Sequence, residues 1–94
     1  MIFVDTSAWF AAYVPNDAHH QAADAFLRAV HERLVTTDWV LDELLTLLKA
    51  RGEFHRAVVL GDRLLRGVPA RLEWVQAADV LQAWNIFETH KDKA

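Results

Sequence analysis

Short apolar runs alternate with longer amphipathic stretches along the chain. Three short runs are typical of buried strands, at residues 2–5 (IFVD), 34–37 (LVTT) and 71–75 (RLEWV). The stretches between and after them carry apolar residues at the i, i+3, i+4 spacing of helices that bury one face. Helices are predicted from residue 6 or 7 to the VPND break, through 23–30, over 38–51, over 53–66, and near 80–87.

The predicted order of elements is βααβααβα, in a single domain spanning residues 1–94. Strands that alternate with helices indicate an α/β fold with a short, mostly parallel sheet of about three strands, flanked by about five helices. Ligands of such sheets bind beyond the carboxyl ends of the strands. Asp5 closes the first predicted strand, so it occupies that kind of position.

Composition narrows the class of protein. The chain is 53% hydrophobic, so it can fill a core, and its 24% of charged residues argues against disorder. The absence of cysteine excludes disulfides and thiolate catalysis. No stretch approaches the roughly 20 apolar residues of a membrane span, and the first apolar run has no basic residue before it, so a cytoplasmic protein is expected.

The net charge of −3 excludes a generally basic nucleic-acid binder. The stretch 49–71 is nevertheless basic, with Lys49, Arg51, Arg56, Arg63, Arg66 and Arg71 against two acids. Two interpretations are open: a solvated helix face, or a track for a phosphate backbone. Arg56 and Arg63 share a helix face, because they lie seven positions apart.

Asp5 itself admits two interpretations. It can cap the helix that follows, where its charge suits the positive end of the helix dipole. It can also bind a metal, because Mg²⁺ prefers oxygen ligands and is often held by one or two carboxylates together with substrate phosphate.

A second group of acids lies in the segment TTDWVLDELLTLLK. Helical spacing places Asp42 on a polar stripe opposite the leucines. Asp38 lies at the start of the helix and is predicted to be its N-cap. Glu43 differs, because Val40 and Leu47 are its neighbours on the helix face. It is therefore predicted at the border of the apolar face, where a cleft can form.

These segments resemble the VapC-type PIN-domain family, small metal-dependent ribonucleases that are mostly toxins of toxin–antitoxin pairs. The resemblance rests on MIFVDTSAWFA, LVTTDWVLDELLTLL and LEWVQAADVLQAWNIF, in the order that the family has them. It implies that Asp5 and Glu43 are catalytic acids that hold Mg²⁺ or Mn²⁺, and that Thr6 is the hydroxyl after the first acid. An RNA substrate and a cognate antitoxin are the implied partners.

Ser7, Arg56 and Arg63 join Thr6 as candidate substrate contacts. Contact of the two arginines with an antitoxin stays open beside contact with RNA. Trp39, Trp74 and Trp84 lie in or beside apolar patterns and are predicted in the core, and packing is also the favoured role of Trp9.

The resemblance also implies that further acids and two further strands follow in the family. The chain is therefore expected to be a PIN-like domain that is incomplete at its C-terminus, and Asp92 is not assigned the role of a missing acid. In the family the first strand is central, so its free edge is expected to drive self-association.

Three alternative functions are compatible with this sequence. The first is a metal-dependent endoribonuclease with an incomplete acidic site, impaired in cleavage on its own. The second is a non-catalytic PIN module that binds an antitoxin or itself. The third is a small α/β domain whose acids only cap helices, which the resemblance disfavours.

Overall fold

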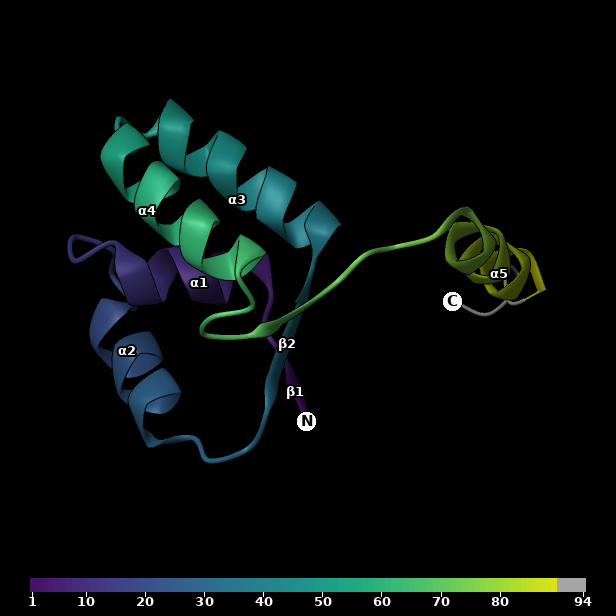
Figure 1. Cartoon of the computed structure of the whole chain (residues 1–94), viewed down its shortest axis with the longest axis horizontal. Coiled ribbons are helices and arrows are strands. Elements are labelled where there is room, and N and C mark those ends of the chain that lie inside the picture. The colour runs from purple at the N-terminus through teal and green to yellow at the C-terminus, as the bar shows by residue number, and fades with distance from the viewer. Residues whose placement is uncertain (90–94) are drawn as a thin grey trace.

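The structure is a computed structural model that describes residues 1–89. Asp92 lies outside the described residues. The predicted order of elements is confirmed (Figure 1). The elements are β1 (Ile2–Phe3), α1 (Thr6–Tyr13), α2 (His20–Ala29), β2 (Leu34–Thr37), α3 (Asp38–Ala50), α4 (Phe54–Leu65), β3 (Arg71–Glu73) and α5 (Ala77–Thr89).

The three strands form a parallel sheet in the order β1-β2-β3. Thr37 pairs with Glu73, so β2 and β3 end together, whereas β1 ends at Phe3 opposite Val35. The carboxyl ends of the parallel strands point to the same edge of the sheet. Within residues 1–89, β1 pairs with β2 alone and its other edge is unpaired. This is the free edge that the sequence predicts for IFVD.

The core lies between the sheet and the layer of α1 to α4. Helix α1 packs against α2 and α3, and α3 packs against α4. The most deeply buried side chains come from three of these helices and β2: Trp9, Leu44, Leu48, Leu60, Leu64 and Thr36. The leucine-rich pattern of residues 38–51 therefore forms the centre of the molecule, as its spacing predicts.

The contact between α3 and α4 depends on Gly61. A Cβ at this position would meet Leu45 Cδ2 at 3.1 Å, which is tight. The two helices approach closely because Gly61 has no side chain, as the sequence predicts for this position. Gly52 ends α3 with a φ of +76°, a left-handed conformation that glycine adopts at little cost.

Helix α5 stands apart from the other helices, beyond the segment that follows β3 (Figure 1). The prediction that three tryptophans are in the core is wrong: Trp39, Trp74 and Trp84 are 60%, 58% and 56% exposed. Trp84 stacks on Phe87 within α5, with ring centroids 5.7 Å apart. An apolar helical pattern predicts a face that can be buried, but it does not name the surface that buries it. Trp9, by contrast, is fully buried, as expected.

No helix within residues 1–89 is both long enough and apolar enough to cross a lipid bilayer.

Candidate active site

Asp5 lies at the carboxyl end of β1, where the chain turns into α1. The backbone N–H of Val4 donates to Val35 O at 2.8 Å, which is the last hydrogen bond before the turn. Asp5 is the N-cap of α1, and its Oδ1 accepts from the backbone N–H of Thr6 at 2.6 Å. The side chain is exposed. The capping interpretation is therefore confirmed. The metal-binding interpretation stays a prediction that this geometry permits, because capping uses one carboxylate oxygen and the side chain is exposed.

The two hydroxyls after Asp5 have different surroundings. Thr6 is buried, and its Oγ1 has no hydrogen-bond partner within the described part of the chain. A buried hydroxyl without a partner is unusual, because desolvation without a compensating hydrogen bond costs about 1–3 kcal/mol. The group is therefore suited to hydrogen-bond a water or ligand held beside Asp5. Ser7 is exposed.

Glu43 lies on α3 next to the core. Leu44, the following residue, is fully buried, whereas the Glu43 side chain is exposed. Its neighbours Val40 and Leu47 are partly buried and pack against the core. The predicted position at the border of the apolar face is therefore confirmed by the burial of the residues around Glu43.

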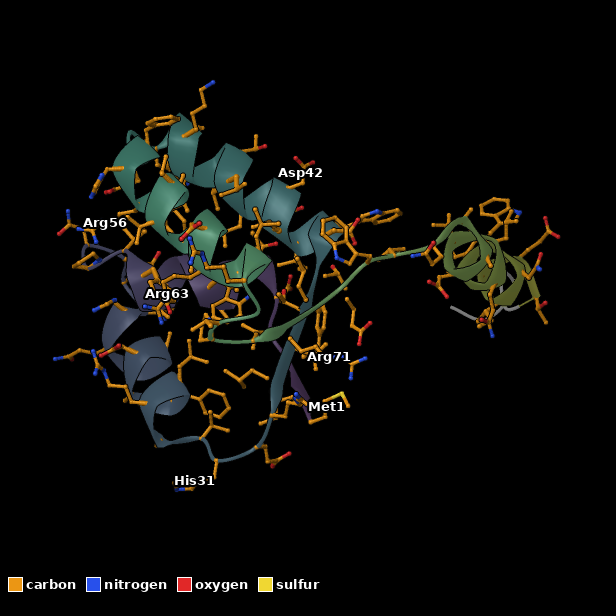
Figure 2. The ribbon with its side chains drawn as sticks, viewed as in Figure 1. Met1, His31, Asp42, Arg56, Arg63 and Arg71 are labelled. Carbon is orange, nitrogen blue, oxygen red and sulfur yellow. The ribbon has the colours of Figure 1, made fainter. Side chains whose placement is uncertain are left out.

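The other two acids of this segment have separate roles. Asp42 is exposed and projects outward from α3 in Figure 2, as predicted. Asp38 is the first residue of α3 rather than its cap, because Thr37 Oγ1 accepts from the backbone N–H of Val40. Asp38 Oδ1 instead accepts from the backbone N–H of Val75 at 2.7 Å, and so ties the end of β2 to the segment after β3.

A hollow of about 380 Å³ lies beside α1 and α3. It lies between α1, the start of α2 and the second half of α3. Ser7, two residues after Asp5, lines it from α1, and Leu47, one turn after Glu43, lines it from α3. Arg51 also lines it, with its guanidinium carbon 5.8 Å from the centroid of the Phe10 ring. The hollow therefore lies near both acids along the chain, but neither Asp5 nor Glu43 lines it.

The carboxylates of Asp5 and Glu43 are the kind of ligand that binds a hard divalent cation. Carboxylate oxygens are the ligands that Mg²⁺ prefers, and the cation retains several waters. Residues 1–89 contain no group of three or more His, Asp or Glu side chains placed to hold a metal. Asp5 and Glu43 therefore remain the two candidate ligands that the sequence predicts, without a larger acidic cluster within those residues.

Arg56 and Arg63 come together at another place. Both line a hollow of about 450 Å³ beside Ala12 and Tyr13, at the end of α1 opposite to Asp5 (Figure 2). Arg56 is paired with Glu53 at 2.9 Å and donates to Tyr13 O at 3.3 Å. The predicted shared helix face is thus real, but it lies away from the turn that carries Asp5.

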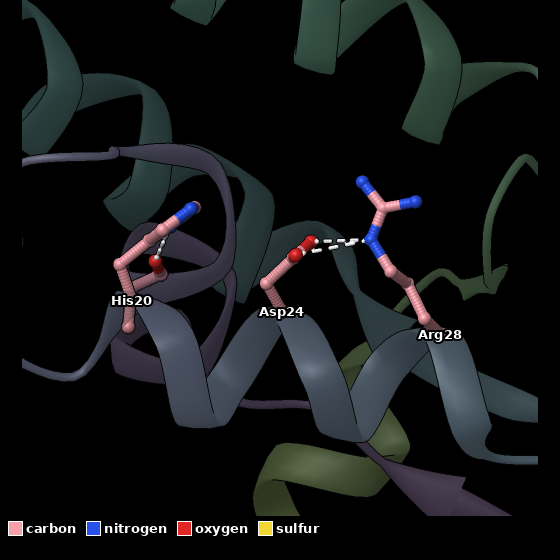
Figure 3. A network of polar contacts seen from close by, with 4 residues as sticks. His20, Asp24 and Arg28 are labelled. Carbon is pink, nitrogen blue, oxygen red and sulfur yellow. Dashed lines mark hydrogen bonds and ion pairs between the residues drawn. The ribbon is translucent and has the colours of Figure 1, made fainter.

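Helix α2 lines this second hollow with a row of three polar side chains. The sequence pattern was not used to predict this row. His20, Asp24 and Arg28 follow one another at four-residue intervals on one side of α2 (Figure 3). Asp24 accepts from Arg28 Nε at 3.0 Å through both oxygens, and His20 Nδ1 lies 2.8 Å from Ala11 O. Because a carbonyl only accepts, His20 carries its proton on Nδ1. The four-residue spacing is the signal in the sequence that reveals the row.

Comparisons with known proteins agree with this architecture. The PIN domain family profile matches residues 2–94. The chain is 36% identical over 93 residues to a protein named 23S rRNA-specific endonuclease VapC20, found in two strains of Mycobacterium tuberculosis. The match covers 99% of this chain and 70% of that protein.

The crystal structure of Mycobacterium tuberculosis VapC20, described as a toxin that cleaves the sarcin–ricin loop, superimposes with a TM-score of 0.83. The two chains are 34% identical, and the superposition covers 100% of this chain and 72% of the other. A family profile that spans almost the whole chain and a relative of this similarity lead to one conclusion: the chain belongs to the VapC-type PIN-domain family.

Proposed function

We propose that the chain is an endoribonuclease of the toxin–antitoxin type, which hydrolyses a phosphodiester of RNA with the help of a divalent cation. The family supports the reaction class, because the relatives are named as a 23S rRNA-specific endonuclease. An RNA substrate and a cognate antitoxin are the partners that this function requires. The observation that carries the proposal is that Ser7 and Leu47, which follow Asp5 and Glu43, line one open hollow.

Asp5 and Glu43 would hold Mg²⁺ or Mn²⁺ on the solvent side of the α1–α3 contact. When bound, the cation supplies Lewis acidity, which activates a water for in-line attack and stabilises the leaving oxygen. The N-cap geometry fixes Asp5, because its Oδ1 is held by the backbone N–H of Thr6. The Thr6 hydroxyl, which has no partner within residues 1–89, would hydrogen-bond a water or ligand beside Asp5, and Ser7 lines the hollow that would admit the RNA strand.

A second function is favoured by the size of the acidic site. Two carboxylates neutralise less of a cation's charge than a larger cluster does, and residues 1–89 hold no cluster of three or more candidate ligands. A chain with this site binds the ion weakly and cleaves RNA slowly, unless another chain contributes acids. The alternative function is therefore a non-catalytic PIN module that binds an antitoxin or a second copy of itself.

Calorimetric titration with Mn²⁺ tests the site. We expect the wild type to bind the ion, and Asp5→Asn and Glu43→Gln each to weaken binding about tenfold or more. Asp42→Asn is the matched control, because Asp42 neighbours Glu43 in the sequence, is exposed, and projects away from the body of the fold. Loss of ion binding in Asp42→Asn to the same degree, or no binding by the wild type, would contradict the assignment.

An RNA cleavage assay with the same variants separates the two functions. Slow cleavage that depends on Mn²⁺ and is lost in Glu43→Gln supports the ribonuclease. Ion binding without any cleavage supports the binding module.

A further inference from the structure

Arg51 lines the hollow between α1 and α3, and the proposed reaction assigns it no role. It is the C-cap of α3, and its backbone N–H donates to Leu47 O at 3.0 Å. Gly52, with its positive φ, turns the chain away directly afterwards, so the arginine stands at a fixed corner of the hollow. Glu43, Leu47 and Arg51 follow one another at intervals of one helical turn.

The guanidinium of Arg51 is placed by an aromatic ring rather than by an acid. Its carbon lies 5.8 Å from the centroid of the Phe10 ring, and Phe10 is itself buried. Within residues 1–89 Arg51 makes no ion pair, whereas Arg28, Arg56, Arg66 and Arg71 each pair with a carboxylate. Asp17, the acid that lines the same hollow, instead accepts from the backbone N–H of His19 at 2.9 Å.

A guanidinium held in this way is suited to bind phosphate. Stacking on an aromatic face orients the planar group and leaves its N–H donors free for a bidentate contact with an oxyanion. The rest of the hollow is largely apolar, with the side chains of Leu47, Ala8 and Ala11. Such a surface accepts the apolar face of a nucleoside beside a bound phosphate.

The position of Arg51 along α3 separates it from the cleavage point. Eight residues of helix place the Cα atoms of Glu43 and Arg51 about 12 Å apart. This separation allows a phosphate at Arg51 to be a neighbour, along the strand, of the phosphate held at the acids. Ser7 and Leu47, which lie close to the two acids along the chain, line the same hollow as Arg51.

We propose that Arg51, stacked on Phe10, binds a backbone phosphate of the RNA strand beside the scissile one and thereby sets the strand's register in the hollow between α1 and α3. This inference rests on the proposed ribonuclease function. Arg51 is a positioning residue in this proposal, because it touches the substrate away from the reacting atoms.

The test measures the affinity of a short fluorescein-labelled single-stranded RNA by anisotropy, over a series of salt concentrations and with Ca²⁺ in place of a catalytic cation. Arg51→Ala and Arg51→Gln are compared with Lys49→Ala. Lys49 is the matched control, because it lies in the same last turn of α3, carries the same charge, and lines a different hollow with Phe54 and Val58. Thermal unfolding by circular dichroism checks that each variant is folded.

We expect both Arg51 variants to bind RNA about tenfold more weakly than the wild type, and Lys49→Ala to bind within about twofold of it. We plot the logarithm of the RNA association constant against the logarithm of the salt concentration. The slope of this plot should be less negative by about 0.7 in the Arg51 variants, the change expected when one phosphate contact to a single strand is lost. Equal weakening by Lys49→Ala and Arg51→Ala overturns the proposal, because net charge alone would then explain binding. Unchanged affinity and slope in both Arg51 variants also overturn the proposal for Arg51. The proposed ribonuclease function is unaffected by that result, because the wild type still binds RNA. A wild type that binds no RNA rejects the proposed function together with this inference.

Discussion

The indole of Trp9 and the hydroxyl of Thr36 meet in the core directly below the turn that carries Asp5. Trp9 Nε1 donates to Thr36 Oγ1 at 3.1 Å, and that hydroxyl donates in turn to Val4 O at 3.0 Å. Both side chains are fully buried. One threonine therefore joins α1 to the end of β1, and this contact fixes the direction in which α1 leaves the sheet.

Replacing Thr36 with valine keeps the shape of the side chain and removes the hydroxyl. We expect Thr36→Val to lower the free energy of unfolding by about 1–3 kcal/mol, because the Trp9 N–H is left buried without an acceptor. Urea denaturation measures the change. Thr46→Val is the control: Thr46 is exposed and its hydroxyl donates to Asp42 O, so the loss stays within about 0.5 kcal/mol. Equal losses in the two variants would show that the buried hydrogen bond contributes nothing.

The capping role and the metal-binding role of Asp5 can be separated by two substitutions. Asparagine caps a helix about as well as aspartate, so Asp5→Asn should unfold at nearly the same urea concentration as the wild type and lose Mn²⁺ binding. Asp5→Ala should lose Mn²⁺ binding and also about 0.5–2 kcal/mol of stability. Urea denaturation and calorimetry on both variants provide the comparison. Retention of Mn²⁺ binding by Asp5→Asn would leave Asp5 as a cap only.

Gly61 limits the side chains that the α3–α4 contact accepts. Gly61→Val should destabilise the protein by about 1–3 kcal/mol, because its branched side chain enters space already filled by Leu45. Gly61→Ala is the milder comparison. Its Cβ displaces the end of a flexible, half-buried leucine by a few tenths of an ångström, and alanine gains up to about 1 kcal/mol of helix propensity over glycine. Thermal unfolding should therefore rank alanine well above valine, and the reverse order would reject the close approach.

The free edge of β1 provides a test of self-association. Phe3 is 56% exposed on this strand, and an unpaired apolar edge recruits other strands. We expect the mean mass from light scattering to rise with concentration in the wild type and to fall to that of a monomer in Phe3→Lys. Phe54→Lys makes the same exchange at an exposed aromatic residue of α4 and should leave the association unchanged. A wild type that stays monomeric at every concentration would contradict the prediction.

The spacing of apolar residues predicts β2 and the buried face of α3. The strand 34–37 is predictable because its apolar residues lie between a polar loop and a helix. The cap of α3 is Thr37 rather than the predicted Asp38. The leucines of α3 recur at helical spacing, so the burial of Leu41, Leu44 and Leu48 follows from the sequence. For the same reason the sequence predicts that Asp42 is solvated and that Glu43 borders the core.

Periodicity alone cannot place a residue against a partner that is distant in the sequence. The exposure of Trp39 and Trp74 shows this, because their apolar surroundings predict burial and the fold leaves them at its surface. Arg56 and Arg63 share a face by spacing, yet only the packing of α1, α2 and α4 reveals that this face lies at the far end of α1 from Asp5.

By itself, the sequence determined the order of the elements, the buried leucines of α3, and the position of Asp5 at the carboxyl end of the first strand. Tertiary structure alone decided which surfaces face one another: Thr36 beneath the Asp5 turn, Ser7 and Leu47 across one hollow, and Arg51 over Phe10. The physical reason is that local spacing fixes the direction of a side chain relative to its own helix or strand. Contacts between elements depend on how whole helices pack, and that packing is set by many residues at once.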